Sequence, residues 1–236
     1  MIAIVSDTVP CLAENRLENL GYDVHKLPPH PALPSPIASH PDMLLFFAPD
    51  AILCTRSYAA VAKWELNRIQ RATGLSIRPI AEDYGPCYPH DILLNAARVG
   101  DRLFCLPSHT SKAILDLPHQ RICAVRQGYA KCSTVPIGAH AMITEDPSIT
   151  DAAKKNGVEV LQISPGNVQL QGYDTGFLGG ACSFAPYGDW NTLLVCGALD
   201  LHKDAQRVRA FLDRYGVSPI SLTDAPPVDV GTIFII

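Results

Sequence analysis

A glycine followed by a short extended segment recurs at four places in the chain, each time after a stretch with apolar residues at helical spacing. The four glycines are Gly21, Gly74, Gly157 and Gly216. Glycine readily takes the left-handed conformation that ends a helix, and the alternating polarity that follows it is typical of a strand. The sequence therefore predicts a repeated helix–strand unit.

Another predicted strand comes before each helix, and a motif in which polar residues precede an apolar run comes before that strand. The strands that directly precede the helices cover 3–5, 51–54, 102–105, 141–144 and 192–196. The five opening motifs start at His40, Tyr88, Lys131, Tyr173 and Val228. Each complete unit therefore has the order ββαβ.

The last motif, which starts at Val228, has no second strand or helix after it. Residues 1–6, 12–20 and 22–27 supply these elements from the start of the chain. We therefore predict a single α/β domain over residues 1–236, a closed ring of five pseudo-symmetric units around a central channel. Pairing between the two ends of the chain closes the ring and removes an exposed sheet edge. The approximate units are 38–83, 87–126, 127–164, 168–222, and 226–236 together with 1–27.

An ordinary doubly wound α/β sheet is the alternative, because strands that alternate with helices suggest one by default. Two features favour the ring. Two strands precede each helix, and the chain has no glycine-rich strand-to-helix turn of the kind that binds phosphate.

Composition limits the classes of function. Hydrophobic residues make up 47% of the chain and charged residues 18%, which is enough apolar material for a buried core. The net charge of −4, without a run of lysine or arginine, argues against nucleic acid and anionic membranes as partners. Eight cysteines lie scattered without metal-binding spacing, as in a cytoplasmic protein with reduced core thiols. We predict no metal and no cofactor, and the oligomeric state stays open.

A ring of five ββαβ units resembles the pentein, or β/α propeller, fold of the guanidino-group-modifying enzymes, which include arginine deiminase, dimethylarginine dimethylaminohydrolase, agmatine deiminase and glycine amidinotransferase. The resemblance spans the whole chain at the level of the repeat. Segments 128–133, 143–146 and 172–180 are more similar to an uncharacterised bacterial branch of this superfamily. For an enzyme, the resemblance implies a cysteine nucleophile, a histidine in a His-x-Asp motif that transfers protons, and carboxylates that hold the cationic guanidine.

Cys132 is the candidate nucleophile. It opens a predicted strand in a polar context between Lys131 and Ser133, and a neighbouring ammonium favours the reactive thiolate. The segment 131–137 also resembles the cysteine motif of arginine deiminases. The alternative is a packed, inert thiol. Cys182 is a weaker candidate because its neighbours are mostly small and apolar.

Two histidines compete for the role of general acid and base. His40 is followed by Pro41 and Asp42 before an apolar run, which resembles the family's His-x-Asp motif. His90 directly precedes Asp91 in the unit before the cysteine-bearing one. A histidine near its ordinary pKa can transfer protons at neutral pH, and only one is needed. Either could instead be structural, His40 in a turn and His90 at the surface.

Four aspartates occupy the opening positions of four units, so the pseudo-symmetry predicts that they surround one axis. They are Asp42, Asp91, Asp174 and Asp229. Carboxylates that converge repel one another unless a cation or hydrogen-bond donors are present. A small cationic ligand, or Lys131 in the remaining unit, satisfies that need, and Asn95 and Ser133 are candidates for neutral contacts. The aspartates could also simply cap backbone amides.

One departure from the enzyme pattern leaves the function open. The family's cysteine lies near the C-terminus, whereas segment 228–236 of this chain contains no cysteine. We therefore expect either a cysteine-dependent hydrolase or transferase of guanidines or amidines with its site moved to Cys132, or a non-catalytic protein. A non-catalytic ring could be a binding scaffold, like the ribosome anti-association factors that share the fold, or a small-molecule sensor.

Overall fold

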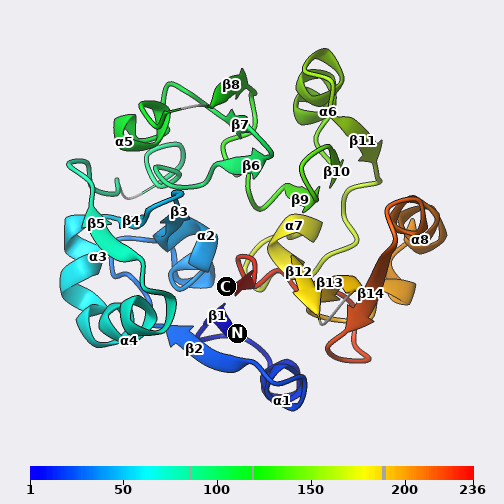
Figure 1. Ribbon diagram of the computed structural model, residues 1–236, viewed down its shortest axis with the longest axis horizontal. Helices are drawn as coiled ribbons and strands as arrows, with labels where there is room; N and C mark the ends of the chain where they lie inside the picture. The colour runs from blue at the N-terminus through cyan, green and yellow to red at the C-terminus, as the bar shows by residue number, and fades with distance from the viewer. Residues whose placement is uncertain (86, 119, 188–189) are drawn as a thin grey trace.

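The computed structural model describes residues 1–85, 87–118, 120–187 and 190–236, and it contains five three-stranded sheets arranged around a common centre (Figure 1). In every sheet the central strand pairs antiparallel with one neighbour and parallel with the other. In unit order the sheets are β3 (Phe46–Phe47), β4 (Ala51–Cys54) and β5 (Ser76–Pro79); β6 (Ala97–Val99), β7 (Arg102–Cys105) and β8 (Arg121–Ala124); β9 (Thr134–Ile137), β10 (Ala141–Thr144) and β11 (Glu159–Gln162); β12 (Cys182–Tyr187), β13 (Trp190–Val195) and β14 (Val217–Ser221); and β15 (Phe234–Ile235), β1 (Ile2–Ser6) and β2 (Asp23–Leu27).

The helices that connect the parallel strands lie on the outside of the ring (Figure 1). They are α1 (Cys11–Asn19), α3 (Arg56–Val61) with α4 (Lys63–Thr73), α5 (Lys112–Leu115), α6 (Pro147–Lys155) and α8 (Ala205–Asp213). Their apolar faces pack against the sheets: Leu17 of α1, Ile69 of α4 and Leu212 of α8 are all fully buried. Burial of such side chains is the main favourable term that holds each unit together.

The glycine signals are confirmed. Gly21, Gly74, Gly157 and Gly216 all have positive φ angles, between 62° and 87°. At each of these positions the chain leaves a helix and starts the third strand of a unit. The ββαβ order and the predicted second strands are therefore correct, with shifts of one or two residues at some ends.

The structure differs from the prediction in two units. In the first unit, the single helix that the repeat predicts before Gly74 is two helices, α3 and α4, separated at Ala62, which has φ −99° and ψ 27°. In the fourth unit, the short helix α7 (Leu178–Ala181) stands between the opening motif and β12. A similar short helix, α2 (Pro41–Leu44), precedes β3 in the first unit. The two 3-10 turns are η1 (Ser35–Ile37) and η2 (Leu199–Leu201).

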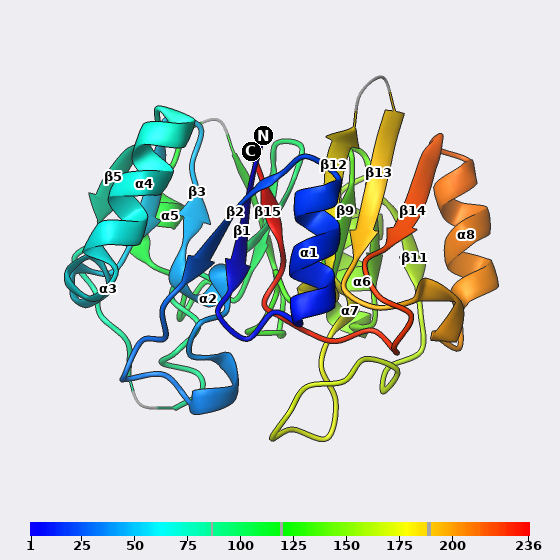
Figure 2. The same ribbon diagram turned by 90° about the horizontal axis from the view of Figure 1, so that it is seen from below.

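The fifth unit is assembled from both ends of the chain. β15 pairs antiparallel with β1, and Ile2 and Ile236 exchange two backbone hydrogen bonds of 2.8 and 3.1 Å. Figure 2 shows the two termini side by side. The edge of β1 that would otherwise be exposed is thereby paired.

Within the described part of the chain, no helix is long and apolar enough to cross a membrane.

The paired termini predict that the ring tolerates a circular permutation. Joining residues 236 and 1 by a short glycine–serine linker and opening the chain between Pro165 and Gly166, in an exposed turn, keeps every unit intact. We expect its melting temperature to stay within about 5 °C of the original. Deleting residues 232–236 removes β15, so we expect a loss of more than about 10 °C. Circular dichroism measures both, and equal losses would show that the β15–β1 pair does not hold the ring.

Candidate functional site

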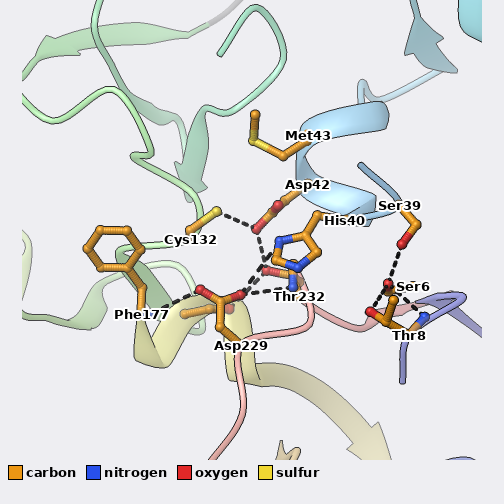
Figure 3. A network of polar contacts seen from close by, with 12 residues as sticks. Ser6, Thr8, Ser39, His40, Asp42, Met43, Cys132, Phe177, Asp229 and Thr232 are labelled. Atoms are coloured by element: carbon orange, nitrogen blue, oxygen red, sulfur yellow. Dashed lines mark hydrogen bonds and ion pairs between the residues drawn. The ribbon is translucent and has the colours of Figure 1, made fainter. Parts of the chain in front are cut away.

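The loops that open several units meet at the centre of the ring. His40 and Asp42 come from the start of α2, and Cys132 lies in the turn just before β9. Asp229 comes from the C-terminal segment that leads into β15. All four side chains are buried, with exposures of 4% or less. Residues far apart in the sequence therefore form one polar cluster at the core of the molecule (Figure 3).

The thiol of Cys132 is held between a carboxylate and an amide. Its Sγ lies 3.0 Å from Asp42 Oδ2 and 3.1 Å from Asn95 Nδ2. Asn95 is fixed in turn, since its Oδ1 accepts a 2.7 Å hydrogen bond from the backbone N–H of Lys131. Burial, followed by the charges of Asp42 and Asp229, raises the pKa of the Cys132 thiol well above its usual value. The thiol is therefore protonated at neutral pH and donates to Asp42.

The ammonium of Lys131 interacts with Cys132 through its charge, but its hydrogen bond goes to another residue. Its Nζ donates a 2.8 Å hydrogen bond to Thr232 Oγ1. Thr232 Oγ1 lies 3.1 Å from Asp42 Oδ2, so the ammonium reaches the carboxylate only through a hydroxyl. Burial lowers the pKa of Lys131, while Asp42 raises it.

Thr232 was not found by the sequence reasoning. It is buried and has a φ of 71°, a left-handed conformation that is uncommon and costly for a β-branched residue. Its hydroxyl also lies 2.9 Å from the carbonyl oxygen of Gly179. These contacts place the hydroxyl between Asp42 and Lys131. A threonine after Gly231 gives no signal for this role in the sequence.

Asp229 is stabilised mainly by backbone donors. Its Oδ2 accepts a 2.9 Å hydrogen bond from Phe177 N–H, and its Oδ1 accepts one of 2.9 Å from Gly231 N–H. His40 Nδ1 lies 3.8 Å from Asp229 Oδ1. Burial raises the pKa of Asp229, although His40 and the two amides oppose this shift. The carboxylate thus caps backbone amides, as one reading of the sequence held, and also faces the histidine.

Glycines allow the chain to pack this closely. A Cβ atom on Gly180 would collide with the Asp229 carboxylate, and one on Gly231 would collide with His40. A Cβ on Gly179 would collide with backbone carbonyls of Cys132 and Thr134. Glycine has no Cβ, so Gly179 and Gly180 of α7 allow the backbone and the carboxylate to approach this closely.

A cavity of about 150 Å³ opens onto the cluster. Cys132, His40 and Asp229 line it together with the aromatic side chains of Tyr129 and Phe177. Both ring nitrogens of His40 are buried and have no hydrogen-bond partner among the described residues. Apolar walls with a few convergent polar groups are typical of a small-molecule site.

The other predicted residues lie at different distances from this cavity. Asp91 is buried and accepts a 3.0 Å hydrogen bond from the Tyr129 hydroxyl, so it contacts the wall of the cavity. Burial raises its pKa. Ser133 is also buried, but its hydroxyl has no partner among the described residues. The structure therefore brings Asp91 and Ser133 close to the cluster without placing them in the cavity wall.

Two predicted residues are not part of the cluster. His90 is exposed and packs edge-on against His109, with ring centroids 5.3 Å apart. Asp174 is also exposed: it lies in the loop before α7, whereas Asp42 lies within α2, so the two aspartates do not occupy equivalent positions. The assumption of one aspartate per unit opening is therefore wrong for the fourth unit. Cys182 is buried, and burial raises its pKa.

Glu145, at the end of β10, is a further buried carboxyl that the sequence reasoning did not select. Its Oε1 accepts a 2.9 Å hydrogen bond from Leu178 N–H, at the start of α7. Burial raises its pKa from about 4.5 to about 7. Among the described residues, histidine, cysteine, aspartate and glutamate side chains form no group of three that could hold a metal ion.

Comparison with known proteins identifies the fold. A family model described as a family of unknown function, DUF6873, matches residues 4–234. No curated protein matches the chain. Dimethylarginine dimethylaminohydrolase (DDAH) from Pseudomonas aeruginosa, in complex with citrulline, has a similar structure, with a TM-score of 0.52 at 12% identity over 93% of this chain and 90% of that chain.

Two further solved structures are similar. The amidinotransferase SxtG from Microseira wollei, of the saxitoxin biosynthetic pathway, has a TM-score of 0.54 at 13% identity over 97% of this chain and 84% of that chain. Agmatine deiminase from C. jejuni has a TM-score of 0.52 at 11% identity over 94% and 86%. With five ββαβ units around one centre, the chain has the pentein fold, as the repeat predicted.

Asn95 is predicted to hold the cluster together. In Asn95→Ala the backbone N–H of Lys131 loses its acceptor in a buried region, so we expect a loss of about 3 kcal/mol in the free energy of unfolding. Urea denaturation measures the change. Asn191→Ala, at an exposed position of β13, is the matched control and should change stability by less than about 0.5 kcal/mol. Similar values for both variants would contradict the structural role of Asn95.

Glu145 predicts a pH dependence of stability. Its pKa is raised on folding, so the unfolded chain releases the proton at lower pH than the folded protein does. This group therefore makes folding less favourable as pH rises from about 4.5 to about 7, by about 3 kcal/mol in total. Glu145→Gln should gain stability over the original protein across that window, and little below it. Urea denaturation at a series of pH values tests this, and a constant difference would refute it.

Proposed function

The chain belongs to the DUF6873 family, and we propose that it is a cysteine-dependent hydrolase or transferase that acts on a small guanidine or amidine bound at Cys132. The observation that carries the proposal is that Cys132, His40 and Asp229 line one cavity, with Asp42 in contact with the sulfur. The similar structures of DDAH, an amidinotransferase and agmatine deiminase support the same class of chemistry.

The charges of the cluster favour a cationic substrate. Asp42 and Asp229 are both buried, and the Asp42 Oδ1 atom has no partner among the described residues. Lys131 approaches Asp42 only through Thr232, so its charge does not satisfy this oxygen directly. A guanidinium or amidinium is planar, carries one positive charge and offers several N–H donors, which suits a site where Asp229 lines the cavity and Asp42 lies directly behind the Cys132 sulfur.

The same cation would activate the thiol. The pKa of Cys132 is raised partly by the charges of Asp42 and Asp229. A bound cation compensates these charges and lowers the pKa of the thiol, so the nucleophile forms mainly when substrate is present. The reactive thiolate is then rare in the absence of substrate, which protects it from oxidation.

The reaction follows from the contacts of each group. The Cys132 thiol passes its proton to Asp42, its hydrogen-bond partner, and Sγ forms a bond to the amidino carbon. As the carbon–nitrogen bond to the leaving amine breaks, His40 in its protonated form gives that amine a proton. Water, or an acceptor amine in a transferase, then attacks the amidino–sulfur adduct and gives its proton to His40. The thiolate leaves and recovers the proton from Asp42.

His40 suits this role because of its surroundings. Its ring faces the cavity that Cys132 lines, and neither nitrogen makes a hydrogen bond to another described residue. Asp229, 3.8 Å from Nδ1, stabilises the imidazolium that the reaction requires. Figure 3 shows the ring together with Cys132, Asp42 and Asp229. His90, which is exposed, is not suited to the role.

A non-catalytic binding ring is the second candidate. The observation that favours it is the state of the thiol, which is 4% exposed and has a raised pKa. In that case, the cavity binds a cation without forming a covalent bond. Both candidates use the same carboxylates, so only the reactivity of Cys132 separates them.

Labelling with a cationic reagent tests the reactivity. We expect 2-chloroacetamidine to alkylate Cys132 much faster than its neutral analogue 2-chloroacetamide does, with a rate ratio at least about tenfold larger than at the exposed Cys11 and Cys87. The carboxylates attract the cation, and the bound cation then stabilises the thiolate beside it. Peptide mass spectrometry over time gives the rates at each cysteine of the same sample.

Matched variants complete this test. Asp42→Asn should reduce the rate ratio at Cys132, whereas Cys182→Ala, which removes another buried thiol, should leave it unchanged. His40→Asn should retain labelling, because chloride leaves without a proton, but lose any turnover of guanidines. If Cys132 in the folded protein shows no preference for the cationic reagent, the proposal of a catalytic cysteine fails and the binding ring is favoured.

A further inference from the structure

A second cavity lies next to the central cluster, and apart from Asp42 its lining residues take no step in the proposed chemistry. Its volume is also about 150 Å³, and it shares no lining residue with the cavity at Cys132. Arg98, Lys131 and Asp42 supply its charged groups, and three phenylalanines belong to its apolar wall. These are Phe46, Phe47 and Phe234.

Arg98 is the charged side chain of this cavity whose hydrogen-bond donors have no acceptor among the described residues. It lies on β6 and is half-buried, and its guanidinium stands over the ring of Phe46 at 5.5 Å from the ring centre. It makes no hydrogen bond or ion pair with any described side chain or carbonyl. Burial lowers its pKa, and no carboxylate opposes that shift. A half-buried guanidinium without an acceptor is unusual, because its donors are normally satisfied.

Lys131, the other cationic side chain of this cavity, already makes contacts within the protein. Lys131 Nζ donates to Thr232 and lies 5.8 Å from the centre of the Phe234 ring. Burial lowers the pKa of Lys131 and Asp42 raises it, although the ammonium reaches that carboxylate only through the Thr232 hydroxyl. Arg98 is therefore the charged group of this cavity that has no polar partner among the described residues.

We propose that this second cavity binds a small monocarboxylate with an apolar tail. The carboxylate accepts hydrogen bonds from the planar fork of Arg98, which matches its geometry, and the ammonium of Lys131 adds a favourable charge. The tail packs against the phenylalanine rings. One negative charge suits the site because Asp42 in the wall repels a second.

The size of the cavity limits the tail. An apolar cavity of about 150 Å³ is large enough for a benzene ring, so a tail of about six carbon atoms fills it. The site is built from residues outside the cavity that Cys132 lines, so it is independent of whether the cysteine is catalytic. It therefore goes beyond the proposed function.

Ligand binding to the full chain tests the proposal. Benzoate is the probe, and isothermal titration calorimetry gives its dissociation constant in the Cys132→Ala protein, where no covalent chemistry at that cysteine can interfere. We expect benzoate to bind at least about tenfold more tightly than the neutral benzamide, which has the same ring. Inorganic phosphate, which has no apolar tail, should bind more weakly than benzoate by a similar factor.

A charge-removing substitution then assigns the site. Arg98→Met keeps the aliphatic stem, and it should weaken benzoate binding by at least about tenfold while leaving benzamide unchanged. Arg121→Met, at an exposed position of β8 in the same sheet, is the control and should leave both unchanged. If benzoate and benzamide bind equally tightly to the protein that keeps Arg98, the proposal is overturned. Binding of benzoate that Arg98→Met does not weaken would also overturn it.

Discussion

The antiparallel pairing of β15 with β1 is the contact on which the rest of the structure depends. It joins the two ends of the chain into one sheet and leaves no unit open. It also fixes the course of the C-terminal segment that carries Asp229 and Thr232 into the centre. If this segment were free, the cavity at Cys132 would lose Asp229, the carboxylate that lines it, and Lys131 would lose its acceptor. The closure of the ring and the geometry of the polar cluster therefore both depend on the pairing of β15 with β1.

The cluster shows how a protein can bury several charges in one place. Asp229 is compensated by two backbone amides, and Asp42 by a thiol and a hydroxyl. Neither carboxylate forms a direct ion pair with Lys131, whose ammonium contacts Thr232 instead. Such an arrangement is less favourable than a set of paired charges, because buried charge that is satisfied only in part is costly. A ligand that supplies a positive charge would therefore bind favourably, because it would reduce the electrostatic cost of the two buried carboxylates.

The two cavities at the centre of the molecule differ in the charges of the residues that line them. The first contains the thiol, the histidine and Asp229, and it suits a cation. The second contains Arg98 and Lys131 beside Asp42, and it suits an anion. Asp42 belongs to the wall of the second cavity while its Oδ2 contacts the sulfur that lines the first. The hydrogen bonds from Lys131 through Thr232 to Asp42 thus connect the two sides of the molecule's centre.

The sequence by itself determined the repeat, because the glycines that end helices and the alternation that follows them are local signals. Gly74 and Gly157 mark their helix ends correctly, and the split fifth unit follows from counting elements. The sequence also selected Cys132, His40 and Asp42, since each lies at the opening of a unit. Only the tertiary structure decided which of these openings reach the centre. Asp174 does not, because it lies in an exposed loop before its short helix and not within the helix as Asp42 does, and Thr232 does, because distant segments hold it in a left-handed conformation. The raised pKa of the thiol likewise depends first on its burial and then on two carboxylates from other units, since burial and charge act through space and not along the chain.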